Sequence, residues 1–156
     1  MNFDEAFERL IGHEGGYVDD PRDPGKATKF GISQRSYPGE DIRGMTLERA
    51  KTIYLRDYWG PAGCDLVPDG IKFDLFDTAV NSGVKTATRM LQRAVKEADD
   101  GVIGPRTMTA IQLADPGRLL ARFNGWRLDF LNDNPQQWTA FGRGWAQRIA
   151  DNLKAA

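Results

Sequence analysis

The sequence predicts a mainly α-helical protein with one small β-hairpin near its N-terminus. Apolar residues recur at helical spacing through most of the 156 residues, and only residues 17–33 combine turn chemistry with short β-type runs. Hydrophobic residues make up 40% of the chain and charged residues 28%, which are ordinary values for a globular domain. We therefore expect a single domain, 1–156, with two lobes of roughly residues 1–67 and 68–156.

The N-terminal residues predict a short amphipathic helix over residues 3–13. Phe3 and Phe7 lie on its apolar face, and charged side chains lie on the other. Gly15 and Gly16 follow, and glycine commonly ends a helix, so we expect the helix to stop there.

The next segment predicts the hairpin. Residues 19–25 are dense in aspartate, proline and glycine, a composition typical of a turn. We expect short strands at residues 17–18 and 28–33 on either side of this turn.

Helical periodicity returns after residue 39 and continues to the C-terminus. Thr46 is the expected N-cap of the first of these helices, and Pro105 suits the first position of another. Trp126, Trp138 and Trp145 lie at helical spacing with other apolar residues, so we expect them in the core, with Phe141 and Ile149 also facing inward. The expected helices cover residues 46–59, 69–81, 85–98, 105–113, 116–132 and one or two segments from 135 onward.

Composition excludes several function classes. The formal net charge is −1, which gives no general attraction to nucleic acid. Cys64 and His13 are the only residues of their kinds, so an intramolecular disulfide is impossible. A nucleophilic triad, and almost any zinc enzyme, would have to use His13. We expect no cofactor and no metal. The N-terminus has no basic and apolar leader and no run is long enough to span a membrane, so we expect no signal peptide and synthesis in the cytoplasm.

Glu14 is the main candidate for chemistry. It falls at the expected end of a helix, beside two glycines that leave room for a bulky substrate. The negative end of a helix and partly apolar surroundings both disfavour an ionised carboxylate and raise its pKa, as a general acid near neutral pH requires. An ordinary exposed helix end explains the same residues.

A glycosidase needs a second polar group on the far side of the sugar. The predicted turn offers Asp19, Asp20 and Asp23, and Thr28 follows it. A hairpin that folds back over the helix end would bring one of them opposite Glu14. Aspartate is also among the commonest turn residues, so the segment equally fits a turn without catalytic function.

A series of sequence blocks runs from residue 14 almost to the C-terminus. The blocks are Glu14-Gly15-Gly16-Tyr17-Val18-Asp19-Asp20-Pro21-Arg22-Asp23-Pro24-Gly25 with Thr28 and Phe30-Gly31-Ile32, Tyr58-Trp59, Phe76-Asp77, Ala79-Val80-Asn81-Ser82-Gly83, Leu91-Gln92, Asp100-Gly101-Val102-Ile103-Gly104-Pro105, and Gly144-Trp145 with Arg148. Together they resemble glycoside hydrolase family 108, which contains phage endolysins and bacterial N-acetylmuramidases. The block that begins at Glu14 and the block that ends at Gly83 are together quite specific. Lys26 departs from the family, where a second glycine is usual, but removes no catalytic group.

The resemblance implies a lysozyme-like fold and hydrolysis of the β-1,4 bond between N-acetylmuramic acid and N-acetylglucosamine. Glu14 takes the place of the catalytic glutamate. Phage-type lysozymes are similar in placing an aspartate after eight further residues and then a threonine, which points to Asp23 and Thr28 as the groups that hold the water. Asp19 and Asp20 remain rivals for this role.

Other residues are candidates for substrate binding. Tyr17 and Tyr58 suit stacking on sugar faces, as does Trp59, for which core packing is at least as good an explanation. Asp20 lies on the same turn as the catalytic candidates. Asn81 suits a bond to an N-acetyl group, although a helix cap explains it too.

The C-terminal half raises a further expectation. Residues 100–105 with Thr107 resemble the turn of small peptidoglycan-binding domains, and in the family this half is described as a peptidoglycan-binding region. A turn followed by a helix N-terminus explains the same residues. We expect this half to be the second lobe of one enzyme and not a separate binding module.

The expected function is that of an endolysin that binds and cuts bacterial peptidoglycan as a monomer, without nucleic acid or stable membrane association. The resemblance implies that it waits in the host cytoplasm until a holin gives access to the wall. A non-catalytic wall-binding or secretion-regulatory protein is the first alternative, against which an intact Glu14 argues. A peptidase is a weaker alternative, because His13 and Cys64 form no familiar motif.

Overall fold

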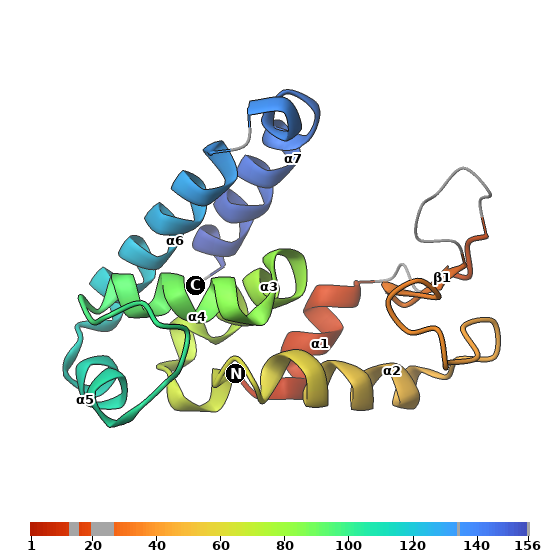
Figure 1. Cartoon of the computed structure of the whole chain (residues 1–156), viewed down its shortest axis with the longest axis horizontal. Coiled ribbons are helices and arrows are strands. Elements are labelled where there is room, and N and C mark those ends of the chain that lie inside the picture. The colour runs from red at the N-terminus through yellow and green to blue at the C-terminus, as the bar shows by residue number, and fades with distance from the viewer. Residues whose placement is uncertain (13–15, 20–26, 134, 156) are drawn as a thin grey trace. The chain divides into compact units, whose positions relative to one another are not determined.

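The computed structural model describes residues 1–12, 16–19, 27–133 and 135–155 (Figure 1). Helices dominate these residues, and they include a two-stranded antiparallel sheet. The predicted fold class, mainly helical with a small N-terminal hairpin, is confirmed. The chain divides into two compact units, a smaller one of residues 2–57 and a larger one of residues 58–156 with Met1. The lobe boundary expected near residue 67 lies inside the larger unit, and the division into lobes stays a prediction.

The elements agree closely with the helices expected from periodicity. Helix α4 is shorter than expected, since the chain after it turns at Lys96, whose φ is 63°. The residues from 135 onward form a single helix. In chain order the elements are α1 (Phe3–Ile11), β1 (Thr28–Lys29), β2 (Ile32–Ser33), α2 (Leu47–Tyr54), the π-helix η1 (Leu55–Trp59), the 3₁₀-helix η2 (Cys64–Leu66), α3 (Asp69–Ser82), α4 (Val84–Ala94), α5 (Pro105–Leu113), α6 (Pro116–Asn132) and α7 (Pro135–Lys154).

Helix α1 ends earlier than the sequence predicts. A capping box starts it, in which the Asn2 side chain accepts from the Glu5 backbone N–H and the Glu5 carboxylate accepts from that of Asn2, both at 2.9 Å. It ends at Ile11, because Gly12 takes a φ of 59° as its C-cap. The expected end at residue 13 is therefore wrong. The predicted helix-dipole effect on the pKa of Glu14 relied on that longer helix.

The hairpin contains a second turn that the sequence analysis missed. Thr28 pairs with Ser33 and Lys29 with Ile32, so the single strand expected over residues 28–33 is two strands. Phe30 and Gly31 between them have φ values of 49° and 75°, as a two-residue hairpin turn requires.

Tyr54 fixes this turn within the smaller unit. Its hydroxyl donates to the Phe30 carbonyl at 3.1 Å, and its buried ring packs edge-on against Phe7 with 5.4 Å between the centroids. A Cβ at Gly31 would lie 2.5 Å from the same hydroxyl, so only glycine fits there. The core of the smaller unit thus joins α1, α2 and the hairpin.

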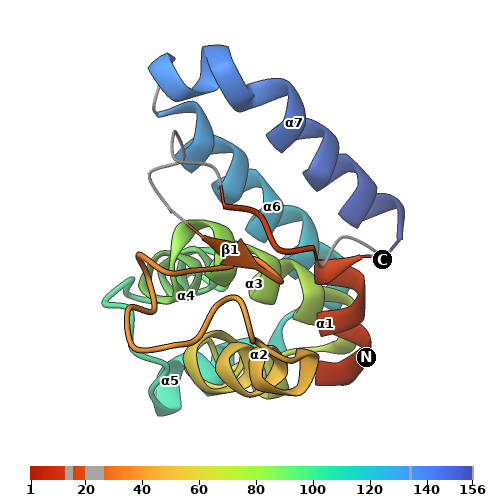
Figure 2. The ribbon, with the colours of Figure 1, turned by 90° about the vertical axis from the view of Figure 1, so that its right-hand side faces the viewer.

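Helix α3 lies at the centre of the larger unit. Most of its side chains are buried. Helices α4 and α6 pack against it, and α7 lies beside α6, as Figures 1 and 2 both show. Trp59 packs edge-on against Phe76 of α3, with 5.4 Å between the ring centroids. The buried positions of α3 also include two carboxylates, those of Asp74 and Asp77.

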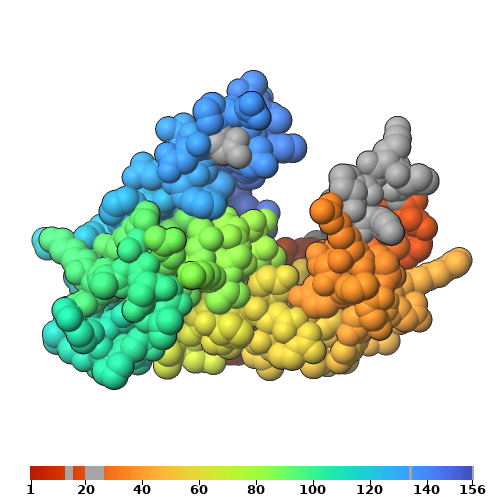
Figure 3. Space-filling model, in the orientation of Figure 1, coloured from red at the N-terminus to blue at the C-terminus, as the bar shows by residue number. Residues whose placement is uncertain are grey.

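Two aromatic residues expected in the core, Trp126 and Phe141, are exposed. Figure 3 shows the far end of the α6–α7 pair (blue) extending beyond α3 and α4 (green). Trp126 is 37% exposed although the Arg93 guanidinium of α4 lies 5.3 Å from the centre of its ring, and Phe141 is 58% exposed. The prediction of a core position is wrong for both residues, whereas Ile149 is buried as expected.

Candidate functional site

The residues predicted for catalysis and binding fall into three groups. Glu14, Asp20 and Asp23 lie outside the residues that the structure describes, as does His13. Thr28 and Tyr17 belong to the smaller unit. Tyr58 and Asn81 belong to the larger unit.

The strand residue Thr28 pairs with a neighbouring strand segment on each of its two sides. It pairs with Ser33 of β2, and it forms an isolated antiparallel bridge with Val18. Its backbone N–H donates to the Val18 carbonyl at 2.7 Å and its carbonyl accepts from the Val18 N–H at 2.9 Å. The bridge confirms the strand pairing expected around the turn. It also brings together the two ends of the aspartate-rich segment, next to a half-buried Thr28.

Tyr17 contacts one of the rival aspartates. Its hydroxyl donates to Asp19 Oδ2 at 3.3 Å. Partial desolvation, followed by the charge of the Asp19 carboxylate, raises the pKa of Tyr17. The Tyr17 side chain is 39% exposed, and it stays a candidate for contact with a sugar.

Tyr58 and Trp59 differ in exposure although they are neighbours in η1. Trp59 is 1% exposed and packs against Phe76, so core packing explains it. Tyr58 is half-buried and stays a candidate for binding.

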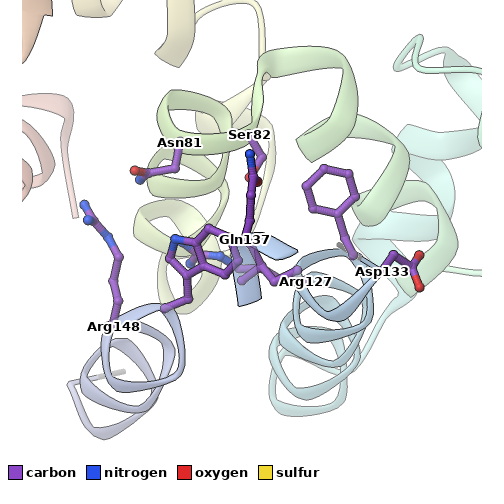
Figure 4. Close-up of a pocket in the computed structure, with 9 residues that line it drawn as sticks. Asn81, Ser82, Arg127, Asp133, Gln137 and Arg148 are labelled. Carbon is purple, nitrogen blue, oxygen red and sulfur yellow. The ribbon is translucent and has the colours of Figure 1, made fainter. Parts of the chain in front are cut away.

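Asn81 is held by a buried carboxylate one turn earlier in α3. Its amide nitrogen donates to the Asp77 carbonyl at 2.7 Å and to Asp77 Oδ1 at 3.0 Å. Because the nitrogen is engaged, the amide oxygen faces away from Asp77. Asn81 is itself exposed at the end of α3 (Figure 4).

Asp77 is the centre of a polar cluster that joins three helices. Arg127 of α6 donates to its Oδ2 at 2.6 Å, and Arg148 Nε of α7 donates to its Oδ1 at 2.8 Å. Arg148 Nη2 lies 2.7 Å from the same Oδ1 in an ion pair. Asn152 of α7 adds a longer bond of 3.3 Å. Asp77 is fully buried, so this carboxylate depends on its partners for compensation. In the sequence, Phe76-Asp77 and Arg148 stand out only as parts of the resemblance, and no local pattern indicates a role for them.

A pocket of about 560 Å³ lies beside this cluster. Its polar lining comes from the end of α3, from α6 and the residue after it, and from α7: Asn81, Ser82, Arg127, Asp133, Gln137 and Arg148. Apolar side chains of α6 and α7 complete it. In Figure 4, Arg148 extends on the side of Asn81, whereas Asp133 lies on the opposite side of the pocket. This pocket is formed by the larger unit alone.

The turn after α4 is held by Gln92, which stands out in the sequence only as part of the resemblance. The Gln92 amide nitrogen donates to Asp100 Oδ1 at 2.7 Å, to the Val102 carbonyl at 3.0 Å and to Thr107 Oγ1 at 3.3 Å. Its oxygen accepts from the Gly101 N–H at 2.8 Å. The Gln92 bond lowers the pKa of Asp100. These contacts use the polar groups of the turn within the chain, which supports its explanation as a structural turn.

Other candidates for chemistry gain no support. Cys64 is buried, and desolvation raises the pKa of its thiol well above the usual range. Among the described residues, no three potential metal ligands lie close enough together to hold an ion. A separate finding is that the helices in this part of the chain include no candidate for a membrane span.

Comparison with known proteins identifies the class. The family model of glycosyl hydrolase 108 matches residues 7–83, and a model described as a predicted peptidoglycan domain matches residues 86–150. The solved structure of SagA from Brucella abortus is 32% identical, with a TM-score of 0.86, over 98% of this chain and 92% of that one. Among curated proteins no sequence matches.

These findings define a helical glycoside hydrolase with a peptidoglycan-type C-terminal region. The chain belongs to the glycosyl hydrolase 108 family. Both the family and the lysozyme-like fold class that the sequence implied are confirmed.

Proposed function

We propose that this protein hydrolyses the β-1,4 bond between N-acetylmuramic acid and N-acetylglucosamine in bacterial peptidoglycan. One observation carries the proposal: a glycosyl hydrolase model over residues 7–83 is followed directly by a peptidoglycan domain model over residues 86–150. The first matched segment supplies a candidate acid, and the second indicates the polymer on which it acts.

In the proposed mechanism Glu14 is the general acid and donates its proton to the leaving glycosidic oxygen. Asp23 is ionised, stabilises the oxocarbenium character of the transition state and orients a water molecule, with Thr28 as the second anchor of that water. The support for Thr28 is its position beside the Val18 bridge, where the strand backbone is fixed. Tyr17, Asp20, Tyr58 and Asn81 are proposed to contact the substrate.

The test replaces the proposed acid and keeps the shape of its side chain. Glu14→Gln is expected to abolish the loss of turbidity of a peptidoglycan suspension and to leave the circular dichroism spectrum unchanged. Glu8→Gln is the matched control, because Glu8 is an exposed glutamate on α1. Wild-type lysis by Glu14→Gln overturns the assignment of the acid.

Product analysis tests the bond that is cut. Mass spectrometry of fragments released by the wild-type protein is expected to show reducing muramic acid ends. New peptide termini would instead identify a peptidase. No released fragment at all would favour the non-catalytic alternative.

We also propose an endolysin's route to the wall, with synthesis in the cytoplasm, release through a holin-permeabilised membrane and action as a monomer. The resemblance to phage endolysins supports this route. Fractionation of expressing cells before and after holin expression tests it, and size-exclusion chromatography with light scattering tests the monomer.

A further inference from the structure

The pocket beside the Asp77 cluster belongs mainly to the segment that matches the peptidoglycan domain model. Its lining residues on α6 and α7 fall within residues 86–150, and Asn81 and Ser82 complete it from the end of α3. The pocket therefore lies where a contact with peptidoglycan is expected, and its lining indicates which part of that polymer it fits.

One side of the pocket offers a hydrogen-bond acceptor. The amide nitrogen of Asn81 donates to both the carbonyl and the carboxylate of Asp77, which fixes the orientation of the amide group. The Asn81 oxygen is then free to accept a bond, and none of the residues that the structure describes donates to it. A ligand that meets this oxygen needs an N–H or O–H donor.

The same side of the pocket carries an excess of positive charge. Two guanidinium groups, those of Arg127 and Arg148, share the single carboxylate of Asp77. Arg127 is buried, and its Nε and Nη1 have no acceptor among the described residues. The Arg148 side chain is 43% exposed, so a ligand can reach it. An anionic acceptor at Arg148 would compensate this charge.

Apolar side chains form a further part of the lining, whereas Gln137 and Asp133 complete it, the latter on the side opposite Arg148. The apolar side chains are those of Phe130 and Leu131 of α6 and Trp145 of α7. The ring of Trp145 lies 5.9 Å from that of Phe141 and 6.2 Å from that of Trp138, so neighbouring aromatic rings hold it in place. These apolar side chains suit a small apolar group of a ligand, such as a methyl group, with which they make dispersion contacts.

We propose that this pocket binds the C-terminal residue of a peptidoglycan stem peptide. The terminal carboxylate pairs with Arg148, the amide N–H of the same residue donates to Asn81 Oδ1, and its methyl side chain contacts Trp145. This inference rests on the proposed action on peptidoglycan. It gives the larger unit a contact with the peptide part of the polymer and makes the substrate contact proposed for Asn81 a contact with the stem peptide.

The positive charge of Arg148 favours the peptide part of peptidoglycan over the glycan part as the ligand of this pocket. The sugars of peptidoglycan carry hydroxyl and acetamide groups and, where the lactyl group bears a peptide, no charge. Free carboxylates come from the stem peptide. An arginine that is compensated only by a shared aspartate discriminates between a carboxylate and a neutral amide, because a bond to an ionised acceptor is about twice as strong as a neutral one.

The first experiment varies the ligand and leaves the protein unchanged. A synthetic stem pentapeptide that ends in D-alanine is titrated into the wild-type protein, with the Trp145 indole N–H signal followed by NMR, and its C-terminal carboxamide is titrated in the same way. The carboxamide is expected to bind at least tenfold more weakly. Equal affinities for the two peptides would overturn the proposal.

The second experiment varies the protein. Arg148→Gln is expected to weaken binding of the free acid at least tenfold and to remove the difference between acid and carboxamide. Arg143→Gln is the matched control, because Arg143 is an exposed arginine on the same helix outside the pocket. Arg148→Lys should retain part of the affinity if charge is what matters. Unchanged binding by a folded Arg148→Gln protein would contradict the assignment.

Hydrolysis of peptide-free glycan chains separates this inference from the proposed function. The wild type is expected to cut peptide-bearing chains faster than peptide-free chains, and Arg148→Gln is expected to lose this preference. If the wild type cuts both kinds of chain equally and binds no pentapeptide, the inference fails and the proposed function stands. If it binds the pentapeptide and cuts neither, the proposed function fails.

Discussion

Arg127 Nη2 lies 2.6 Å from Asp77 Oδ2, and both side chains are buried although fifty residues separate them in the sequence. The pair joins α6 to the central helix of the larger unit. Arg148 shares the same carboxylate from α7, so one aspartate holds three helices together. Because a buried charge without its partner is costly, the stability of this unit should depend on Asp77.

Asp77→Asn should therefore lower the free energy of unfolding by about 3–5 kcal/mol, since it leaves the buried Arg127 charge uncompensated. Urea denaturation followed by circular dichroism measures this change. Asp133→Asn is the control, because Asp133 is an exposed aspartate just after α6. A loss close to that of the control would show that the cluster contributes little.

Gly31→Ala should destabilise the smaller unit through two effects. A residue with a side chain at a φ of 75° costs about 1–2 kcal/mol, and the new Cβ would also meet the Tyr54 hydroxyl. Tyr54→Phe removes that hydroxyl, so the cost of Gly31→Ala should be smaller in a Tyr54→Phe background. Thermal unfolding of the four proteins of this cycle tests the prediction.

The control for the glycine substitution is Gly39→Ala, where a Cβ would meet no atom within 4 Å. It should change the unfolding temperature little. Equal costs of Gly31→Ala with and without the Tyr54 hydroxyl would contradict the proposed contact and leave only the backbone effect.

Gln92→Ala should loosen the turn at residues 99–105. It removes the acceptor of the Gly101 N–H and the donor to Asp100, so the bonds that order this turn are lost. Amide exchange at Gly101 should become faster, as measured by NMR. Gln112→Ala, at an exposed position of α5, should leave that exchange rate unchanged.

Acid should destabilise the protein partly through Asp57. Arg56 donates to its carboxylate at 2.6 and 2.7 Å and Tyr37 at 3.0 Å, and these bonds, that of Arg56 first, lower the pKa of Asp57. A carboxyl with a lowered pKa in the folded state stabilises the protein above its unfolded pKa of about 4. That contribution is lost as the pH falls through the folded value.

Asp57→Asn should consequently show a smaller loss of stability than the wild type between about pH 5 and pH 2. Urea midpoints across this range measure the difference. Asp129→Asn, at an exposed position of α6, should follow the wild-type curve. Parallel curves for the wild type and Asp57→Asn would show that the Arg56 and Tyr37 bonds do not change the titration.

The partner of Glu14 should be identified by comparing asparagine variants at Asp19, Asp20 and Asp23. Asp23→Asn is expected to cost the most activity, about 10²-fold or more, if Asp23 orients the water. NMR of the first product should show inversion at the anomeric carbon. Retention of configuration would instead require carboxylates about 5 Å apart and a nucleophilic aspartate.

The helices were largely predictable because their signals are local. Thr46 accepts a bond from the Arg49 N–H as the expected N-cap, and Pro105 and Pro116 begin helices where proline suits the first turn. The end of α1 was not predictable in the same way, since Gly12 and the two later glycines all fit a helix end. The exposure of Phe141 was not predictable either, since periodicity shows which side chains share a helix face and not whether another element covers that face.

The sequence by itself determined the mainly helical class, the hairpin, and Glu14, Asp23 and Thr28 as candidates, because caps, turns and motifs depend on residues close together in the chain. Only the tertiary structure decided that Asp77 is buried between two arginines 50 and 71 residues away. No local pattern encodes such a pairing, since it forms only when α3, α6 and α7 pack together. The same packing produced the pocket to which we assign the stem peptide.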